Sequence, residues 1–129
     1  MTVLRIVPNL AHPDPAASRA FWQDLLGMAP AMDMGWIVTW SPPMDRLDEP
    51  QQRPQVSVMS QGGEGAPVPD LSVEVDDVDA VHARARSMGL PIERPLTDEP
   101  WGVRRFFVRE PGGRLVNILS HAQDPLPQP

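Results

Sequence analysis

The feature that most constrains the fold is a plan that the chain repeats. An apolar, strand-like segment near the N-terminus leads to Asp14, and a helical pattern then runs to Gly27. A second strand-like segment, LSVEV, leads to Asp77, and a second helical pattern runs to Gly89. The two glycines lie 62 positions apart, about half the chain, so the sequence predicts an internal duplication. In each copy an aspartate is expected to cap the helix and a glycine to end it.

Three strand candidates follow each helix, and turn residues separate them. They lie at residues 29–34, 35–41 and 54–60 in the first copy and at 91–96, 103–110 and 114–121 in the second. The chain is therefore predicted to be an α+β domain of two βαβββ modules. The expected boundaries are a single domain at 1–123, with module one at 1–60, a linker at 61–68 and module two at 69–121, followed by a flexible tail at 124–129.

The strand at 69–75 alternates between apolar and polar side chains. Leu71, Val73 and Val75 are expected to face the helix, whereas Ser72 and Glu74, like Asp70, point to the opposite side. A polar inner face is more typical of a lined cavity than of a solid core.

Composition excludes several kinds of chemistry. The chain has 129 residues, a net charge of -6 and no cysteine, so a basic nucleic-acid footprint and thiolate chemistry are both excluded. All basic residues are arginine, which excludes a Schiff-base or phosphate-loop lysine. No segment has the length of a membrane span or the pattern of a signal peptide, so we expect a cytoplasmic protein that binds neither membranes nor nucleic acid.

Three segments resemble motifs of one family. They are VPNLAHPDPAASRAFWQDLLGM, DLSVEVDDVDAVHARARSMGL and RRFFVREPGGRLVNILSH, in this order and spacing. Together with the paired modules they resemble the vicinal oxygen chelate superfamily, which includes glyoxalase I, extradiol dioxygenases and bleomycin-resistance proteins. The resemblance implies a curved mixed sheet around a cavity, and a homodimer.

The resemblance also implies where a metal would bind. Metal-dependent members carry ligands on the first and last strands of each module, which here correspond to Val7, Asp70, Asn117 and either Ser57 or Met59. Only Asp70 is a good ligand for a transition metal, because these ions prefer imidazole or carboxylate groups. Asn117 is a neutral amide in a carboxylate position. We therefore expect degenerate metal positions and no metal or other cofactor, as in the metal-free bleomycin-resistance branch.

Aromatic and polar side chains near these positions are candidates for ligand binding. Trp36 and Trp40 share one side of a strand and could form a stacking wall, although core packing explains them equally well. Trp101 lies in a loop, where ligand contact is the more natural role. Together with Met59, Asp70, Ser72 and Asn117, these residues form the predicted ligand site.

The histidines and arginines give weaker indications. His121 shares the strand side of Asn117 and is the best candidate for a general base, although a surface role is more typical at the end of a strand. His12 is expected in a surface or capping role. Arg104 and Arg105 are expected to form surface ion pairs with nearby carboxylates such as Asp98.

Two functions from different classes remain open. The first is a non-catalytic protein that binds or sequesters a small hydrophobic or aromatic molecule, such as an antibiotic or a metabolite. The alternative is a metal-dependent lyase or dioxygenase, in which an ion polarises vicinal oxygens. The missing ligands favour the first.

Overall fold

The computed structural model describes residues 2–43 and 54–121. The predicted flexible tail and most of the loop at 41–54 lie outside these residues. Two compact units divide the chain, and we call them the N-terminal unit, Val7–Asp70, and the C-terminal unit, Met1–Ile6 with Leu71–Pro129. The unit boundary falls inside the first strand, so the residues before Val7 cluster with the second βαβββ module.

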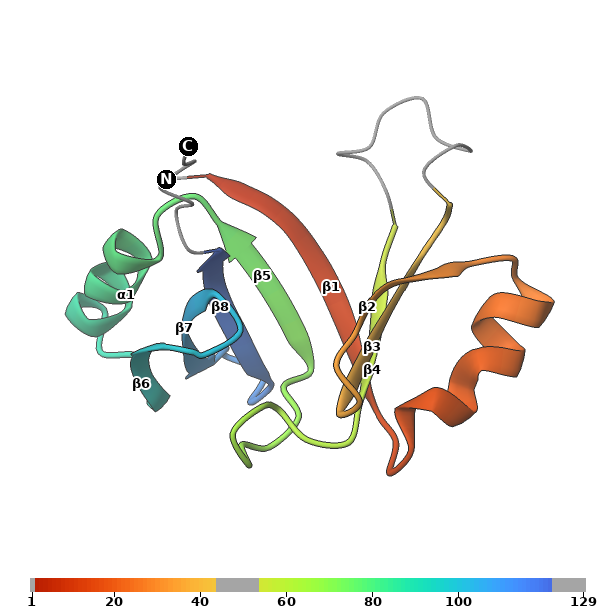
Figure 1. The fold of residues 1–129 in the computed structure, drawn as a ribbon. Helices are drawn as coiled ribbons and strands as arrows, with labels where there is room; N and C mark the ends of the chain where they lie inside the picture. Colours follow the sequence, from red (N-terminus) through yellow and green to blue (C-terminus); the bar gives the residue numbers. More distant parts are fainter. Residues whose placement is uncertain (1, 44–53, 122–129) are drawn as a thin grey trace. The chain divides into compact units, whose positions relative to one another are not determined.

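The N-terminal unit contains one helical region and a mixed sheet (Figure 1). Its strands are β1 (Val3–Ala11, which begins in the other unit), β2 (Ala29–Asp33), β3 (Ile37–Ser41) and β4 (Val56–Met59). Their order is β2-β3-β4-β1, with β4 and β1 parallel and the other neighbours antiparallel.

The C-terminal unit repeats this plan. It contains β5 (Leu71–Val75), helix α1 (Val78–Ser87), β6 (Ile92–Asp98), β7 (Val103–Arg109) and β8 (Leu115–His121). The strand order is β5-β8-β7-β6, with β5 and β8 parallel and the other neighbours antiparallel. The predicted α+β fold with paired βαβββ modules is thus confirmed, and each unit has a mixed sheet.

The two helices end alike but begin differently. Gly27 and Gly89 both adopt φ of 72°, a left-handed conformation that glycine takes without steric cost and that commonly ends a helix. Asp77 caps α1 by accepting a hydrogen bond from the Ala80 backbone N–H at 3.1 Å.

The predicted cap at Asp14 is wrong. The first helical region starts as a 3-10 turn, Pro15–Ser18, and continues as a π-helical segment, Ala20–Leu25. In the tight first turn the backbone carbonyl of Asp14, not its carboxylate, accepts the hydrogen bond from the Ala17 N–H at 2.9 Å. The Asp14 N–H donates to His12 Nδ1 at 2.9 Å, which agrees with the predicted local role of His12.

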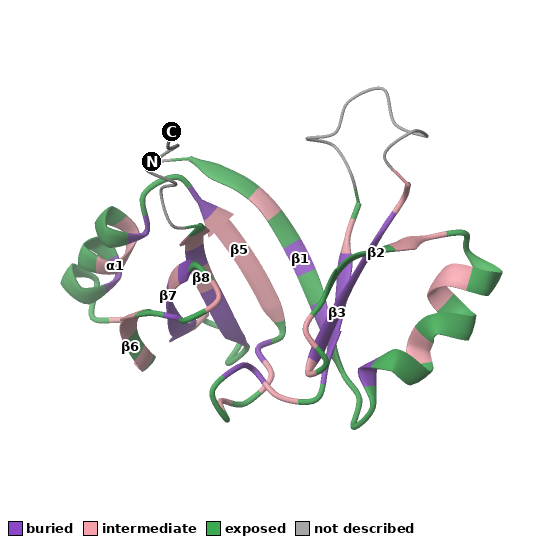
Figure 2. Ribbon diagram, viewed as in Figure 1, coloured by how far each residue is buried: buried purple, intermediate pink, exposed green. Residues whose placement is uncertain are grey.

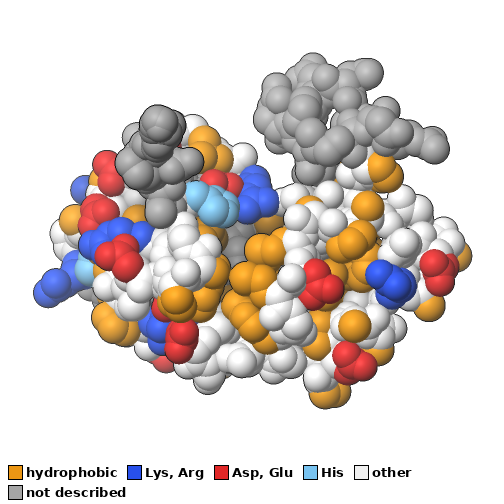
Figure 3. All heavy atoms as spheres, in the orientation of Figure 1, with side chains coloured by type: hydrophobic (Ala, Val, Ile, Leu, Met, Phe, Trp, Pro, Cys, Tyr) orange, Lys and Arg blue, Asp and Glu red, His pale blue; other side chains and the backbone are white. Residues whose placement is uncertain are grey.

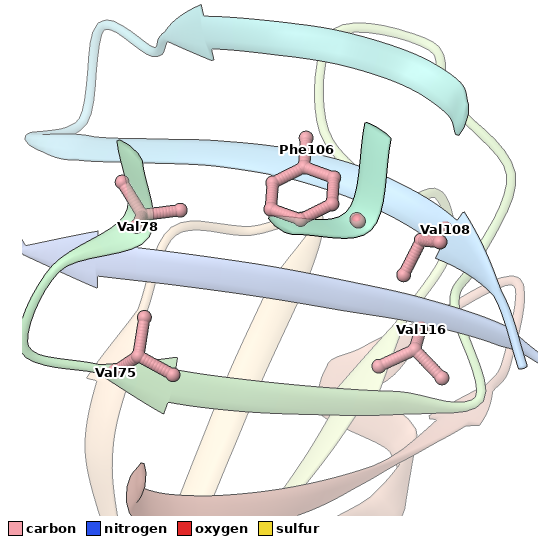
Figure 4. Packing of buried hydrophobic residues seen from close by; sticks show 6 residues of the cluster. Val75, Val78, Phe106, Val108 and Val116 are labelled. Carbon is pink, nitrogen blue, oxygen red and sulfur yellow. The ribbon is translucent and has the colours of Figure 1, made fainter. Parts of the chain in front are cut away.

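The core of the C-terminal unit lies between α1 and one side of its sheet. Phe106 is completely buried there, and its ring meets the His82 ring edge-on at 4.9 Å between centroids. Figure 4 shows valines from β5, α1, β7 and β8 converging on it. The cluster consists of Val75, Val78, Ala85, Phe106, Val108 and Val116. As alternation predicts, every second residue of these strands therefore points away from α1.

The N-terminal unit has its own core on the helical side of its sheet. Trp40 is 2% exposed and packs with Val38, Val56 and Val58, against Trp22 and Met28. Figure 2 shows β3 as a continuously buried strand. Within the described ranges of the chain, no helix is long and apolar enough to cross a membrane.

Candidate functional site

The side of the C-terminal sheet that faces away from α1 carries most of the unit's buried polar groups. We call it the helix-free face. Strand register sets its composition, because residues paired across neighbouring strands point to the same side. Ser72 of β5 pairs with Asn117 of β8, which in turn pairs with Phe107 of β7. In the next row, Glu74 pairs with Leu119 and Leu119 with Arg105.

Asn117 and Ser72 form a buried amide–hydroxyl pair. Asn117 is 7% exposed, and its Nδ2 donates a hydrogen bond to Ser72 Oγ at 3.1 Å. The other polar atom of this amide, Oδ1, is buried and accepts no hydrogen bond from any described residue. Two residues of the predicted ligand site are thus in direct contact, and the amide oxygen is left without a donor among the described residues.

A second polar group lies on the helix-free face, next to the first residues of β1. Glu74 binds Arg5 Nε through Oε1 at 2.6 Å and His121 Nδ1 through Oε2 at 2.7 Å. Partial burial favours a raised pKa for the Glu74 carboxyl, but the His121 hydrogen bond and the Arg5 charge outweigh it and hold the pKa below its usual value. Figure 3 shows histidine, acidic and basic side-chain surface together on this unit. His121 is thus oriented by a carboxylate, as a general base would be, but it is 52% exposed.

A third polar group is a buried ion cluster. Glu99 Oε2 lies 2.5 Å from Arg105 Nε and 2.9 Å from Arg94 Nη2. The Arg105 guanidinium stacks on Trp101 and Phe107, at 4.9 and 4.8 Å from the ring centroids. The predicted surface role of Arg105 is therefore wrong, because its side chain is 3% exposed. Arg104 does reach Asp98, at 3.1 Å, and also Asp79, at 2.9 Å.

The N-terminal unit has an equivalent row of polar residues. Asn9 of β1 pairs with Ser57 of β4, which pairs with Thr39 of β3, and all three are buried. Thr39 Oγ1 and Ser57 Oγ are hydrogen-bonded at 2.8 Å. The parallel pair Asn9–Ser57 corresponds to Ser72–Asn117 in the other unit. Duplication therefore places an amide and a hydroxyl at the same point in each module.

Two of the predicted metal positions, Val7 and Asp70, lie two residues before the paired residues Asn9 and Ser72. Val7 lies on the same side of β1 as Asn9 but before the pair. Asp70 precedes β5, is exposed, and contributes its backbone carbonyl to the Asn9 N–H at 3.0 Å. Of the two candidates for the fourth position, Ser57 belongs to the polar row, whereas Met59 pairs with Ile37 at the strand end. Counting back five residues from Asp14 and from Asp77 would have identified Asn9 and Ser72.

The side chains of the two pairs, Asn9–Ser57 and Ser72–Asn117, do not fit a transition metal. They are two amides and two hydroxyls, whereas zinc, iron and nickel prefer imidazole, thiolate or carboxylate ligands. Within residues 2–43 and 54–121, no three His, Asp or Glu side chains gather as a metal cluster.

The three predicted tryptophans have different surroundings. Trp40 lies in the core on the helical side, and its Nε1 donates to Ser18 Oγ at 3.2 Å, which matches the core-packing alternative. Trp36 precedes β3 and is partly buried; its carbonyl accepts from the Ser60 N–H at 2.9 Å. Trp101, in the turn before β7, is the predicted tryptophan that lies with the C-terminal polar cluster.

Paired βαβββ modules, each with an amide and a hydroxyl residue paired across its two parallel strands, define a duplicated α+β fold. Sequence comparison gives the particular family. The model of the Glyoxalase/Bleomycin resistance protein/Dioxygenase superfamily matches residues 3–118, so the chain belongs to this superfamily. No curated protein matches the sequence.

Solved structures agree on the fold. A chain from the NAD-dependent benzaldehyde dehydrogenase structure of Legionella pneumophila is 19% identical, with a TM-score of 0.69, covering 91% of this chain and 99% of that one. A superfamily member from Vibrio splendidus 12B01 is 20% identical, with a TM-score of 0.61 and coverage of 92% and 99%. Streptomyces coelicolor methylmalonyl-CoA epimerase is 16% identical, with a TM-score of 0.63 and coverage of 95% and 100%.

Proposed function

We propose that this chain binds a small planar organic molecule at the helix-free face of the C-terminal unit and does not transform it. The observation that carries the proposal is the buried Asn117–Ser72 pair, a neutral hydrogen-bonding group at a strand position where the family resemblance implies a metal ligand. Such groups orient an organic ligand well but bind a transition metal weakly.

The surroundings of the pair support this function. Phe107, Leu115 and Leu119 are buried apolar neighbours of Asn117 on the same face, and Trp101 presents its ring close by on Arg105. Apolar and aromatic side chains around a few polar groups are the usual composition of small-molecule sites. Sequestration of an antibiotic or an aromatic metabolite fits this composition.

Binding can be tested with 2-naphthol as the probe, by titration calorimetry and by NMR shifts of Trp101. We expect saturable binding at one site per chain, and Trp101→Ala should weaken it roughly threefold to tenfold through lost aromatic contact. Phe21→Ala removes an exposed ring from the N-terminal unit and should leave the affinity unchanged. Recovery of the probe unaltered by mass spectrometry is expected. Equal affinities of the wild type and Trp101→Ala would contradict the proposed location.

The competing function is a metal-dependent lyase or dioxygenase. It predicts close to one divalent ion per chain after incubation with zinc, nickel or iron salts. We expect far less than one, measured by elemental analysis after desalting. Stoichiometric metal that is lost on Asn117→Leu substitution would favour the enzyme instead.

A further inference from the structure

Asn117 is a costly residue for the position it occupies. Its side chain is buried in a strand whose flanking positions on the same side, Leu115 and Leu119, are leucines. A leucine would bury its whole side chain at this point without leaving a polar atom to be satisfied. The amide therefore calls for an explanation beyond packing.

The neighbours of Asn117 provide a hydrogen-bond partner for only one of the two polar atoms of its amide. Across the sheet on one side lies Ser72, whose hydroxyl accepts the hydrogen bond from Nδ2. Across the sheet on the other side lies Phe107, which has no donor to offer, and neither leucine has one. Ser72 is therefore the one polar side chain among the four that flank Asn117 in the sheet. Among the described residues nothing donates to it.

A buried carbonyl oxygen without a donor destabilises the folded state, because it loses its hydrogen bonds to water and forms none within the protein. The same oxygen becomes favourable when a ligand supplies an N–H or O–H group. It also discriminates strongly, since a ligand with only an acceptor at that point meets a second lone pair.

We propose that Asn117 Oδ1 determines specificity by selecting ligands that present a hydrogen-bond donor, a hydroxyl or an N–H, beside an aromatic or other planar body. This inference rests on the proposed binding function and narrows it to donor-bearing ligands. Because Phe107 is paired with Asn117, we expect the ligand to carry its donor at the edge of its planar group. Oxyanions and ethers are selected against at this point.

The test compares 2-naphthol with 2-methoxynaphthalene, which keeps the rings but replaces the hydroxyl donor by an ether. Dissociation constants come from NMR titrations that also follow the Asn117 side-chain amide. We expect the wild type to prefer 2-naphthol by about fivefold or more, with the amide signal shifting on binding. Asn117→Leu should abolish the preference, whereas Asn117→Asp retains an acceptor and should keep it.

A matched control is Gln23→Leu. Gln23 Oε1 is a second buried carbonyl oxygen without a donor among the described residues, but it lies in the helical region of the N-terminal unit. Its removal should leave the ratio of affinities unchanged. Asn117→Ala also removes the acceptor and serves as the informative variant if Asn117→Leu does not fold.

The outcomes separate the two proposals. If both probes bind the wild type equally, donor selection is wrong while small-molecule binding stands. If the preference persists in Asn117→Leu, another residue accepts the hydrogen bond from the ligand, and Asn117 does not determine specificity. If neither probe binds and no amide signal shifts, both the inference and the proposed location are wrong.

Discussion

Glu99 is a buried carboxylate that two guanidinium groups share. Its side chain is 2% exposed, Arg105 is 3% exposed and Arg94 is 24% exposed. Replacing Glu99 by Gln leaves two cations facing each other away from water, and removing one member of a buried ion pair typically costs about 3–5 kcal/mol. We therefore expect Glu99→Gln to lower the free energy of unfolding by an amount of this order in urea denaturation.

Arg105→Met is the matched comparison, because it leaves the Arg94–Glu99 pair intact. Its effect on the free energy of unfolding should be clearly smaller than that of Glu99→Gln. Equal losses in the two variants would show that charge balance is not what makes Glu99 important.

Glu74 should make stability depend on acid pH. Its pKa is lowered in the folded chain, mainly because the His121 hydrogen bond and the Arg5 charge together exceed the opposing effect of burial. The folded state therefore binds the proton less readily than the unfolded state. The stabilisation is fully present above the unfolded pKa of about 4.3 and is lost as pH falls through the lower folded value.

Urea denaturation of the wild type and Glu74→Gln between pH 6 and pH 3 tests this dependence. The difference in stability between the two should be largest at pH 6 and shrink as pH falls below about 4.3. A difference that does not vary with pH would show that the carboxylate charge contributes nothing. Asp79→Asn is a second case and not a control, since the hydrogen bond from Arg104 also holds the pKa of the exposed Asp79 carboxyl below its usual value.

For single residues, the sequence predicts the side of the sheet on which a strand residue lies, because side chains alternate along a strand. Parity placed Ser72 and Asn117 on one side of the sheet, and the structure pairs them. It could not locate Glu99, which lies in a turn where no periodicity applies, so the burial of Arg105 was also missed. Val7 is the position that the first helix alone indicates, whereas alignment of the two modules at Asp14 and Asp77 indicates Asn9, the neighbour that a two-residue shift of register brings in.

Among the secondary-structure elements, the two helix starts provide a prediction with a built-in comparison. Asp77 accepts a side-chain cap hydrogen bond in α1, whereas Asp14 makes none at the first helical region. Replacing a capping aspartate by alanine usually costs about 1 kcal/mol. Asp77→Ala should therefore lower the free energy of unfolding by about that amount, and Asp14→Ala should cost much less.

Chemical denaturation of both variants measures the difference, with circular dichroism as the signal. Similar losses would indicate that Asp14 contributes by a route other than capping. The sequence alone predicts a cap at both positions, because an aspartate precedes a helical pattern in each. What the pattern cannot show is that the first region opens as a 3-10 turn, in which backbone groups satisfy the first N–H.

For the whole molecule, the repeated βαβββ plan could be predicted because it depends on local signals that recur at one period. Helix-ending glycines, turns and alternating strands need no knowledge of long-range contacts. The division into units could not be predicted in the same way. The first residues of β1 cluster with the second module, where the Thr2 N–H bonds Asp76 Oδ1 at 2.8 Å and Arg5 binds Glu74. Such contacts join residues more than sixty positions apart.

Homodimerisation, expected from the family resemblance, remains a proposal that one surface of β1 supports. Leu4 and Ile6 alternate with Arg5, so they point to the side opposite the Glu74 ion pair, and they are 52% and 58% exposed. Adjacent exposed apolar side chains on a strand are typical of an interaction surface.

Equilibrium sedimentation at micromolar concentration should therefore give the mass of two chains, and Ile6→Glu should shift the population toward one. Leu25→Glu changes an equally exposed leucine in the helical region of the N-terminal unit and should leave the mass unchanged. A wild-type mass of a single chain would contradict the proposal. A dimer that withstands Ile6→Glu but dissociates with Leu25→Glu would instead place the interface on that helical region, because a charge disrupts association only where it becomes buried.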